Sequence, residues 1–416
     1  MKVDVLVIGA GAAGMMAAGI AAQRGFHVCL LEKNHKPGRK IGITGKGRCN
    51  LTNHCSVQDL IASVPTNGRF LFGAVSRFSP CDTMNFFEAL GLPLKTERGN
   101  RVFPQSDKAA DVVDALAKFD ASTGVQNIHG EAKRLIFSDG QIRGVTLTNH
   151  QEILAENVIV CCGGMSYPAT GSTGDGYLLA KQVGHTVTAL RPSLVPLISR
   201  GSACAQMMGL SLRNISIRVV DTTNNKVVFE DFGELLFTHF GLSGPLILSA
   251  SAHMRNMSPG RYRIYIDLKP ALSPEKLDAR LVREFKENKN RDFGNSLSSL
   301  LPRAMIPVAV QKSGIPSHFK CNLITREMRH DFVALLKSFS ITIDGFRPIA
   351  EAIVTSGGIS VKEIDPKTMQ SKLVKGLYFA GEVLDVDAYT GGYNLQIAFS
   401  TGHLAGNSVE KQEETK

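Results

Sequence analysis

The stretch VIGAGAAGMMAAGIAAQRGFHVCLLE, residues 7–32, sets turn glycines inside a long apolar run. A membrane helix would need about 20 apolar residues with few flexible glycines, and a secretion signal would need a basic start and a small-residue cleavage site. Asp4 and the turn glycines fit neither pattern. The segment instead predicts a buried strand, a tight turn, a helix and a second strand, over 3–8, 9–11, 12–24 and 27–31.

The glycines of this unit have the G-x-G-x-x-G spacing of a dinucleotide site. We expect Gly9 to make the sharp turn, Gly11 to let the backbone approach a pyrophosphate, and Gly14 to let the helix pack closely. The helix N-terminus then holds the phosphate through its free N–H groups and its dipole. Glu32 ends the second strand, where an acid hydrogen-bonds the ribose of the adenosine half.

The composition is ordinary for a globular protein, with 43% hydrophobic and 20% charged residues. A chain of 416 residues is long enough for two or three domains. The net charge of +10 favours anionic partners, and a phosphorylated cofactor satisfies this bias as well as RNA does. Eight cysteines without zinc-type spacing suggest neither a metal cage nor a disulfide framework. We therefore expect no metal and a reducing, cytoplasmic compartment.

Two segments that follow this unit favour FAD over NAD. The loop at 33–53 is rich in glycine and basic residues and can wrap a larger cofactor. Near the C-terminus, a short strand at 377–380 ends in Gly381 and Glu382, and a second glycine pair opens a helix at about Tyr393. In flavoproteins an acid at such a strand end bonds the ribityl chain, and a helix N-terminus stabilises negative charge on the reduced ring.

Six motifs together resemble the HI0933-like family of bacterial flavoproteins, which includes aminoacetone oxidases and reductases of oxo-bile-acid intermediates. They are VIGAGAAGMMAA, GRKIGITGKGRCNLTN, CCGGMSYPATGSTGDGYLLAKQVGH, FTHFGLSGPLIL, VTSGGIS and AGEVLDVDAYTGGYNLQIAFSTGHLAG, and they span essentially the whole chain. Two positions depart from the family's pattern, because Lys46 and Ala388 stand where glycines are frequent. Both lie in loops expected near the flavin, so substrate or redox tuning can differ.

The resemblance implies an α/β fold with a discontinuous Rossmann-like FAD-binding domain, an inserted β-barrel-like domain and a small helical subdomain. The expected ranges are 1–190 and 343–416 for the first, 191–270 and 325–342 for the second, and 271–324 for the third. Short alternating runs over 125–160 predict a β-meander, whose backbone near Glu131 and Ala132 is expected to contact the adenine. Strands at 215–220, 226–230 and 262–268 and helices at 273–289 and 326–338 are expected in the insertion.

The motifs and the resemblance together predict a set of cofactor-binding residues. They are Gly9, Gly11, Ala12, Ala13, Gly14, Glu32, Lys33, Arg39, Lys40, Arg48, Cys49, Asn50, Ala132, Cys162, Gly163, Gly164, Gly381, Glu382, Asp385, Gly392, Tyr393, Asn394 and Leu395. The sequence assigns no catalytic residue, and the candidates are His239, Cys49 and Tyr393. His239 lies in a glycine-flanked turn and has the pKa range of a general acid or base, although a structural role is favoured. The adjacent Cys161 and Cys162 are interpreted as small buried residues rather than a redox pair.

These features predict an FAD-dependent oxidoreductase that acts on a small organic substrate and passes electrons to an organic acceptor or oxygen. Only one dinucleotide fingerprint is present, so NAD(P)H as electron donor would bind transiently at the substrate face. A flavin-dependent tRNA-modifying enzyme and a non-catalytic flavin sensor stay open as alternatives. Nucleic acid is not the expected partner, because no RNA-binding signature appears and the charge cluster at 280–291 fits a solvated helix face. No membrane segment is expected, and the motifs do not decide the oligomeric state.

Overall fold

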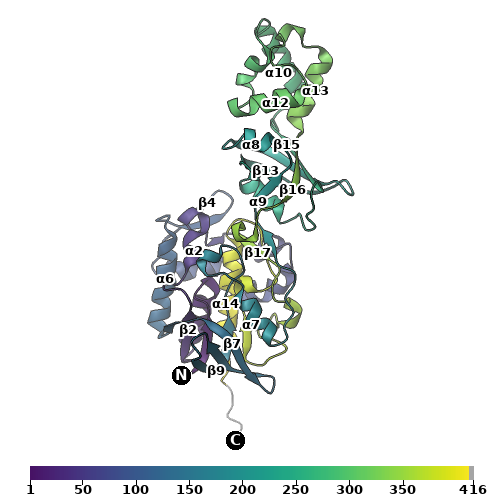
Figure 1. Ribbon diagram of the computed structural model, residues 1–416. Coiled ribbons are helices and arrows are strands. Elements are labelled where there is room, and N and C mark those ends of the chain that lie inside the picture. Colours follow the sequence, from purple (N-terminus) through teal and green to yellow (C-terminus); the bar gives the residue numbers. More distant parts are fainter. Residues whose placement is uncertain (412–416) are drawn as a thin grey trace. The chain divides into compact units, whose positions relative to one another are not determined.

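The computed structural model describes residues 1–411, which form two compact units (Figure 1). Among the described residues, the first unit comprises 1–193 and 349–411, and the second comprises Leu194–Pro348. The segment 271–324, expected as a separate helical subdomain, lies inside the second unit. Each unit has its own hydrophobic core. None of the helices in residues 1–411 has the length and apolar character needed to cross a membrane.

A mixed sheet of seven strands forms the centre of the first unit. Its order is β6-β2-β1-β9-β8-β7, with β18 beside β9. The strands are β1 (Lys2–Ile8), β2 (Val28–Glu32), β6 (Gln126–His129), β7 (Ala132–Ser138), β8 (Gln141–Leu147), β9 (Glu152–Val160) and β18 (Leu377–Phe379). The single meander expected over 125–160 is wrong for β6, which pairs in parallel with β2, while β7, β8 and β9 do form a meander. Residues 5–8 are a continuous apolar run, as expected for β1, because this strand lies between two parallel neighbours in the core.

Two helices from opposite ends of the chain pack against each other beside this sheet. They are α1 (Ala12–Gln23) and α14 (Tyr393–Ser408). A Cβ on Gly402 would lie 2.3 Å from the backbone oxygen of Ala13, and one on Gly406 would lie 2.5 Å from that of Ala17. The helix backbones therefore touch, and only glycine permits this contact.

Further elements surround the sheet. They are α2 (Arg39–Ile43), α3 (Val57–Ala62), α4 (Phe72–Arg77), α5 (Pro80–Ala89), α6 (Ala109–Thr123), α7 (Asp175–Gln182), the three-stranded sheet of β3 (Thr52–Asn53), β5 (Arg101–Pro104) and β4 (Leu94–Glu97), and the strand pair β10 (Arg191–Ser193) and β17 (Val354–Ser356). Helix α6 covers α1, where a Cβ on Gly19 would lie 2.2 Å from the ring of Phe119.

The second unit contains a closed barrel of six strands in the order β11-β14-β13-β12-β15-β16, which confirms the expected barrel. The strands are β11 (Leu197–Ser199), β12 (Ser211–Asp221), β13 (Lys226–Phe237), β14 (Gly241–Ser243), β15 (Tyr262–Asp267) and β16 (Phe339–Phe346). The helices are α8 (Ala203–Gln206), α9 (Pro245–Ser251), α10 (Pro274–Glu287), α11 (Phe293–Ser296), α12 (Ile306–Ser313) and α13 (Arg326–Lys337). Helix α13 packs against α10, α12 and the strands β15 and β16, so barrel and helices share one core.

Asp120 is a buried carboxyl group in the core of the first unit. It is 1% exposed, and its Oδ1 has no hydrogen-bond partner within residues 1–411. Burial raises the pKa of Asp120 to about 8, an effect that the backbone N–H of Gly19 partly offsets. The folded state therefore holds this group protonated at a pH where the unfolded chain ionises it.

We expect Asp120→Asn to raise the melting temperature by roughly 3 °C or more at pH 8, and by less at pH 5. Because the folded pKa lies above the unfolded one, the stability contributed by protonated Asp120 is present at low pH and declines as pH rises from about 4 to about 8. Asparagine does not titrate, so this decline disappears. Thermal melting between pH 4 and pH 9 measures the effect, with Asp114→Asn on the exposed side of α6 as control. Parallel curves for Asp120→Asn and wild type would contradict the assignment.

Candidate functional site

The turn between β1 and α1 is pressed onto the end of β9. Gly9 has a φ of +99°, and a Cβ there would lie 2.7 Å from the carbonyl oxygen of Cys161. A Cβ on Gly14 would lie 1.8 Å from the oxygen of Gly9. Gly11 differs, because no atom of residues 1–411 lies within 4 Å of a Cβ added there. Gly9 and Gly14 are thus required by the protein's own packing, while Gly11 faces open space.

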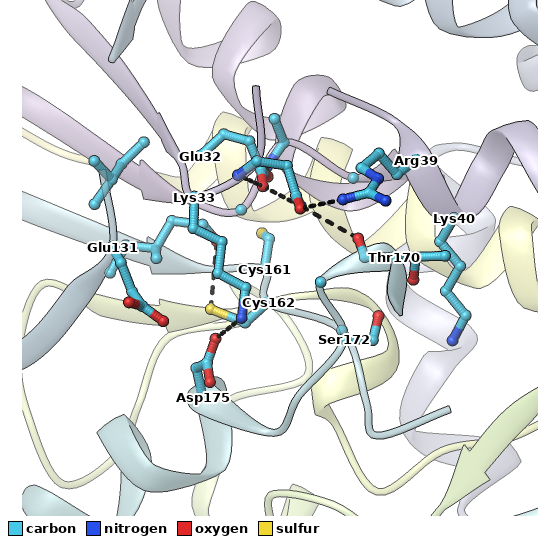
Figure 2. Close-up of a pocket in the computed structure, with 18 of the residues that line it drawn as sticks. Glu32, Lys33, Arg39, Lys40, Glu131, Cys161, Cys162, Thr170, Ser172 and Asp175 are labelled. Atoms are coloured by element: carbon cyan, nitrogen blue, oxygen red, sulfur yellow. Dashed lines mark hydrogen bonds and ion pairs between the residues drawn. The ribbon is translucent and has the colours of Figure 1, made fainter. Parts of the chain in front are cut away.

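A pocket lies against this turn, where β1, β2 and β9 end (Figure 2). The carboxyl ends of parallel strands are where α/β sheets bind ligands. The predicted residues that line the pocket are Gly9, Gly11, Glu32, Lys33, Arg39, Lys40, Ala132, Cys162 and Gly163. Other lining residues include Asn34, Lys36, Glu131, Thr170, Ser172 and Asp175.

The carboxylate of Glu32 is held in a fixed orientation at the edge of the pocket. Its Oε2 accepts a hydrogen bond from the backbone N–H of Ala10 at 2.7 Å. Its Oε1 accepts bonds from the backbone and side-chain nitrogens of Asn34, at 2.8 and 2.7 Å. A carboxylate has about four acceptor positions, so these three bonds leave one for a ligand hydroxyl.

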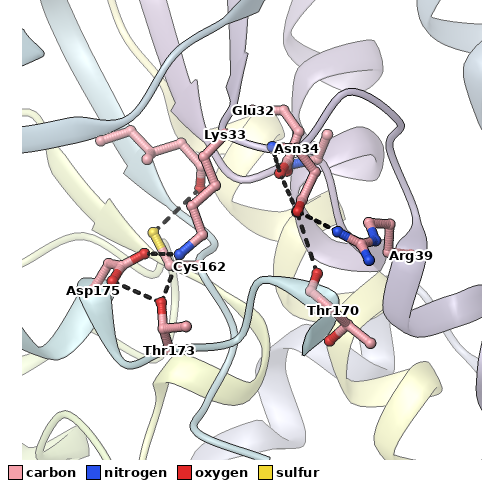
Figure 3. A network of polar contacts seen from close by, with 10 residues as sticks. Glu32, Lys33, Asn34, Arg39, Cys162, Thr170, Thr173 and Asp175 are labelled. Atoms are coloured by element: carbon pink, nitrogen blue, oxygen red, sulfur yellow. Dashed lines mark hydrogen bonds and ion pairs between the residues drawn. The ribbon is translucent and has the colours of Figure 1, made fainter. Parts of the chain in front are cut away.

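Asn34 and Lys33 connect the loop after β2 to the loop after β9 (Figure 3). The Asn34 amide donates to the carbonyl oxygen of Thr170 at 3.2 Å and accepts from Arg39 at 2.8 Å. Lys33 binds the hydroxyl of Thr173 at 2.5 Å and forms an ion pair with Asp175. The sequence reasoning missed Asn34, Thr170 and Asp175. A signal for Asp175 exists, because GSTGDG is a glycine-rich loop that opens a helix.

Glu382 and Lys40 form an ion pair beside the pocket. The Lys40 ammonium lies 2.6 Å from Glu382 Oε2, and Lys40 also donates to the hydroxyl of Ser166 at 2.6 Å. The other oxygen of Glu382 accepts from Ser166 at 3.1 Å and from the backbone N–H of Thr355 at 2.9 Å. A Cβ on Gly164 would lie 2.4 Å from the Thr355 hydroxyl, so a larger residue at this position would collide with the cluster. The cluster joins α2, the loop after β9, β17 and the end of β18.

The N-terminus of α14 presents free backbone donors. Gly392 has a φ of +98°, and a Cβ there would lie 2.3 Å from the oxygen of Thr52. The helix has no capping side chain and no acid in its first turn, which contains Tyr393, Asn394 and Leu395. The side chain of Asn394 instead binds both backbone groups of Ala388, accepting at 2.9 Å and donating at 2.8 Å. The free N–H groups make this end of the helix suitable for negative charge.

Several predicted residues lie outside the pocket lining. Ala12, Ala13 and Gly14 form the buried start of α1. Gly381 and Asp385 follow β18, and a Cβ on Gly381 would lie 2.9 Å from the Cβ of Ala13. Their roles in cofactor binding stay predictions.

The loop at 48–50 contacts the small sheet rather than the pocket. Arg48 pairs with Glu97 and Asp107, and its guanidinium carbon lies 4.2 Å from the centre of the Phe103 ring. Cys49 is 0% exposed, and burial raises its pKa to about 12. Its thiol is therefore protonated at neutral pH, which argues against a catalytic thiolate. Asn50 Oδ1 is buried and has no partner within residues 1–411.

The catalytic candidate His239 and the eight cysteines are distributed over both units. His239 lies after β13 in the second unit, where its ring meets Phe240 edge to face at 5.0 Å. All eight cysteines are free thiols, and Cys161 and Cys162 have pKa values raised by burial. Within residues 1–411 no three His, Cys, Asp or Glu side chains gather as metal ligands would.

The pocket residues fit a dinucleotide cofactor. The open face at Gly11 and the acid-free N-terminus of α1 suit a pyrophosphate. Four cations line the pocket, namely Lys33, Lys36, Arg39 and Lys40. The spare acceptor position on Glu32 suits a ribose hydroxyl.

The chain belongs to the HI0933-like family, because the family model described as "HI0933-like protein Rossmann domain" matches residues 3–408. It is 31% identical to the 3-dehydro-bile acid delta(4,6)-reductase of Clostridium scindens, over 98% of both chains. It is also 31% identical to the ribosomal RNA dihydrouridine synthase of Escherichia coli, over 96% of both chains. The 3-ketosteroid-delta4-(5alpha)-dehydrogenase of Rhodococcus jostii has a similar structure, with a TM-score of 0.54, 14% identity, and coverage of 99% of this chain and 97% of that one. The fold is thus a Rossmann-like FAD-binding α/β fold, and the chain is an FAD-dependent oxidoreductase.

We expect Gly14→Ala to impair folding and Gly11→Ala to impair FAD binding. A methyl group on Gly14 collides with the backbone of Gly9, so Gly14→Ala should unfold or strongly destabilise the protein. A methyl group on Gly11 meets no atom of residues 1–411. The FAD-free Gly11→Ala variant should therefore melt at the same temperature as the FAD-free wild type. It should bind FAD about tenfold more weakly. Thermal melting and fluorescence titration of the apoprotein with FAD measure the two effects. Unchanged FAD affinity in Gly11→Ala would contradict placement of the pyrophosphate at this face.

Proposed function

We propose that this protein reduces a carbon–carbon double bond conjugated to a carbonyl group in a small organic substrate, with NAD(P)H as a transient electron donor. One observation carries the proposal: two relatives that match 98% and 96% of this chain have names that describe this one type of reaction. A 3-oxo bile acid with double bonds at positions 4 and 6 is a conjugated ketone. Dihydrouridine arises when the uracil double bond that is conjugated to a carbonyl is saturated.

The residues that would hold FAD are distributed over both ends of the chain. The pyrophosphate would bind at Gly11 and the N-terminus of α1, the ribose at Glu32, and the adenine along the backbone near Ala132. Glu382 and Lys40 would bind the ribityl chain, and the N-terminus of α14 would face the ring. When bound, FAD supplies hydride acceptance and delivery.

The chain contributes charge stabilisation and positioning. The free N–H groups at the start of α14 favour an anionic ring, because no acid in the first turn competes for them. Asn394 holds the preceding loop through Ala388, which fixes the direction of these donors. Tyr393 is the first residue of this helix, and we propose that it fixes the ring rather than reacting.

The proposal is tested by anaerobic reduction of the FAD-loaded protein with NADPH or NADH, followed by addition of an acceptor. We expect the flavin absorbance to bleach and then to return with 2-cyclohexenone or 4-androstene-3,17-dione, whose products gain two hydrogens by mass spectrometry. Cyclohexanone and 5α-androstane-3,17-dione lack the double bond and serve as matched controls. A flavin that neither nucleotide reduces, or that the saturated ketones reoxidise equally well, would overturn the proposal.

Uridine in ribosomal RNA is a second candidate substrate. The synthases of Escherichia coli and Haemophilus influenzae are 31% and 30% identical to this chain, over 96% and 98% of it. The charge is also unevenly distributed, because residues 194–348 contain 21 Lys and Arg against 13 Asp and Glu, while the rest has 26 against 24. Arg283, Lys286 and Lys289 are exposed at the end of α10, and none of them forms an ion pair within residues 1–411. Such unpaired cations favour a phosphate backbone.

For this candidate we expect dihydrouridine in unmodified rRNA transcripts after incubation with the protein and NADPH, measured by nucleoside mass spectrometry. The triple variant R283E/K286E/K289E should weaken RNA binding about tenfold or more and reduce its salt dependence. Its flavin reduction by NADPH should match wild type. Lys118→Glu on α6 is the control for a single exposed charge in the first unit. The absence of dihydrouridine would leave the small conjugated ketone as the substrate class.

A further inference from the structure

The chain passes between the two units beside one short strand pair. Strand β10 ends at Ser193, the last residue of the first unit before the insertion. Strand β17 begins at Val354, shortly after the chain returns at Ile349. The two strands pair in antiparallel fashion, with Ser193 opposite Val354. The outgoing and returning segments are therefore fixed to each other within the first unit.

Asp387 binds both strands of this pair. Its Oδ2 accepts a hydrogen bond from the Ser193 hydroxyl at 2.8 Å, and its Oδ1 accepts one from the Ser356 hydroxyl at 3.1 Å. Asp387 is 2% exposed. A buried carboxylate is costly without donors, so the two serine hydroxyls are specific partners rather than incidental neighbours.

Asp387 directly precedes the loop at 388–392, which leads into α14. The next residue, Ala388, exchanges two hydrogen bonds with Asn394 in the first turn of the helix. Tyr389 donates its backbone N–H to the oxygen of Ser63 at 3.1 Å, which fixes the loop on its other side. A continuous series of bonds thus runs from Ser193 through Asp387 to Asn394.

The residue after Ser193 needs such support. Leu194 has a φ of +54° and is 1% exposed. A leucine in the left-handed region is disfavoured and persists only where its surroundings hold it. On its other side the backbone N–H of Val195 donates to the Ser251 hydroxyl at 2.9 Å. Leu194 therefore lies between two hydrogen-bonded anchors.

We propose that Asp387 is a positioning residue that couples the crossing at Ser193–Leu194 to the loop that begins α14. One carboxylate then holds both Ser193, the last residue of the first unit before the insertion, and the start of the helix assigned above to the flavin ring. The coupling does not depend on the identity of the substrate. It goes beyond cofactor binding, because Asp387, Ser193 and Ser356 do not line the pocket.

Hydrogen exchange of the FAD-loaded protein, followed by mass spectrometry, tests the coupling. Ser193→Ala removes one hydroxyl on the crossing strand. We expect it to raise exchange about tenfold at 193–195 and also in the distant loop at 386–391, with no change at 2–23. Asp387→Ala should raise exchange in both segments further. Asp387→Asn retains an acceptor oxygen and should restore most of the protection.

Controls separate coupling from a general loss of stability. Ser298→Ala removes an exposed hydroxyl of the second unit and should leave both segments unchanged. Melting temperatures of Ser193→Ala and wild type should agree within about 2 °C. If Asp387→Ala does not fold, the single Ser193→Ala variant still decides the question. Increased exchange at 193–195 without any change at 386–391 would overturn the proposal, whatever the outcome of the activity assays.

Discussion

The contact between α1 and α14 is the constraint on which the first unit depends. Gly402 and Gly406 bring α14 against the backbone of Ala13 and Ala17, at distances that no side chain allows. On the opposite side, Gly14 meets Gly9, and Gly9 meets the end of β9. The dinucleotide turn is therefore held between the C-terminal helix and the central sheet. A methyl group at any of these points would displace the N–H groups that face the pocket.

This arrangement assigns two tasks to residues that look alike in the sequence. Gly9 and Gly14 serve packing, whereas Gly11 leaves space on the ligand side. The acidic residues Glu32, Glu382 and Asp387 also have different roles. Glu32 keeps an acceptor position toward the pocket, Glu382 pairs with Lys40 beside it, and Asp387 is turned inward to the serines of the crossing strands. Position in the fold, rather than residue type, decides each role.

The sequence predicts the elements whose signals are local. The strands and helix over residues 2–32 follow from periodicity and glycine spacing, and the helix at Tyr393 follows from the glycines before it. The pairing of Asn34 with Thr170 and of Lys33 with Asp175 was missed because the partners are 136 and 142 residues apart. The role of Arg48 as a cofactor ligand stays a prediction, and its partners Glu97 and Asp107 lie in segments whose proximity no local pattern indicates. The parallel position of β6 likewise depends on topology.

The discontinuity of the first unit has a consequence for biosynthesis. Residues 194–348 are contiguous and have their own core, so they can fold as soon as they leave the ribosome. The first unit cannot, because β18 and α14 are translated after this insertion, and until then residues 158–160 of β9 have an open edge. At about 5–20 residues per second, roughly 20–80 seconds separate the synthesis of β1 from that of α14. During that interval the end of β9 lacks its partner β18, and a cofactor that binds at α14 can be captured only after α14 has been synthesised.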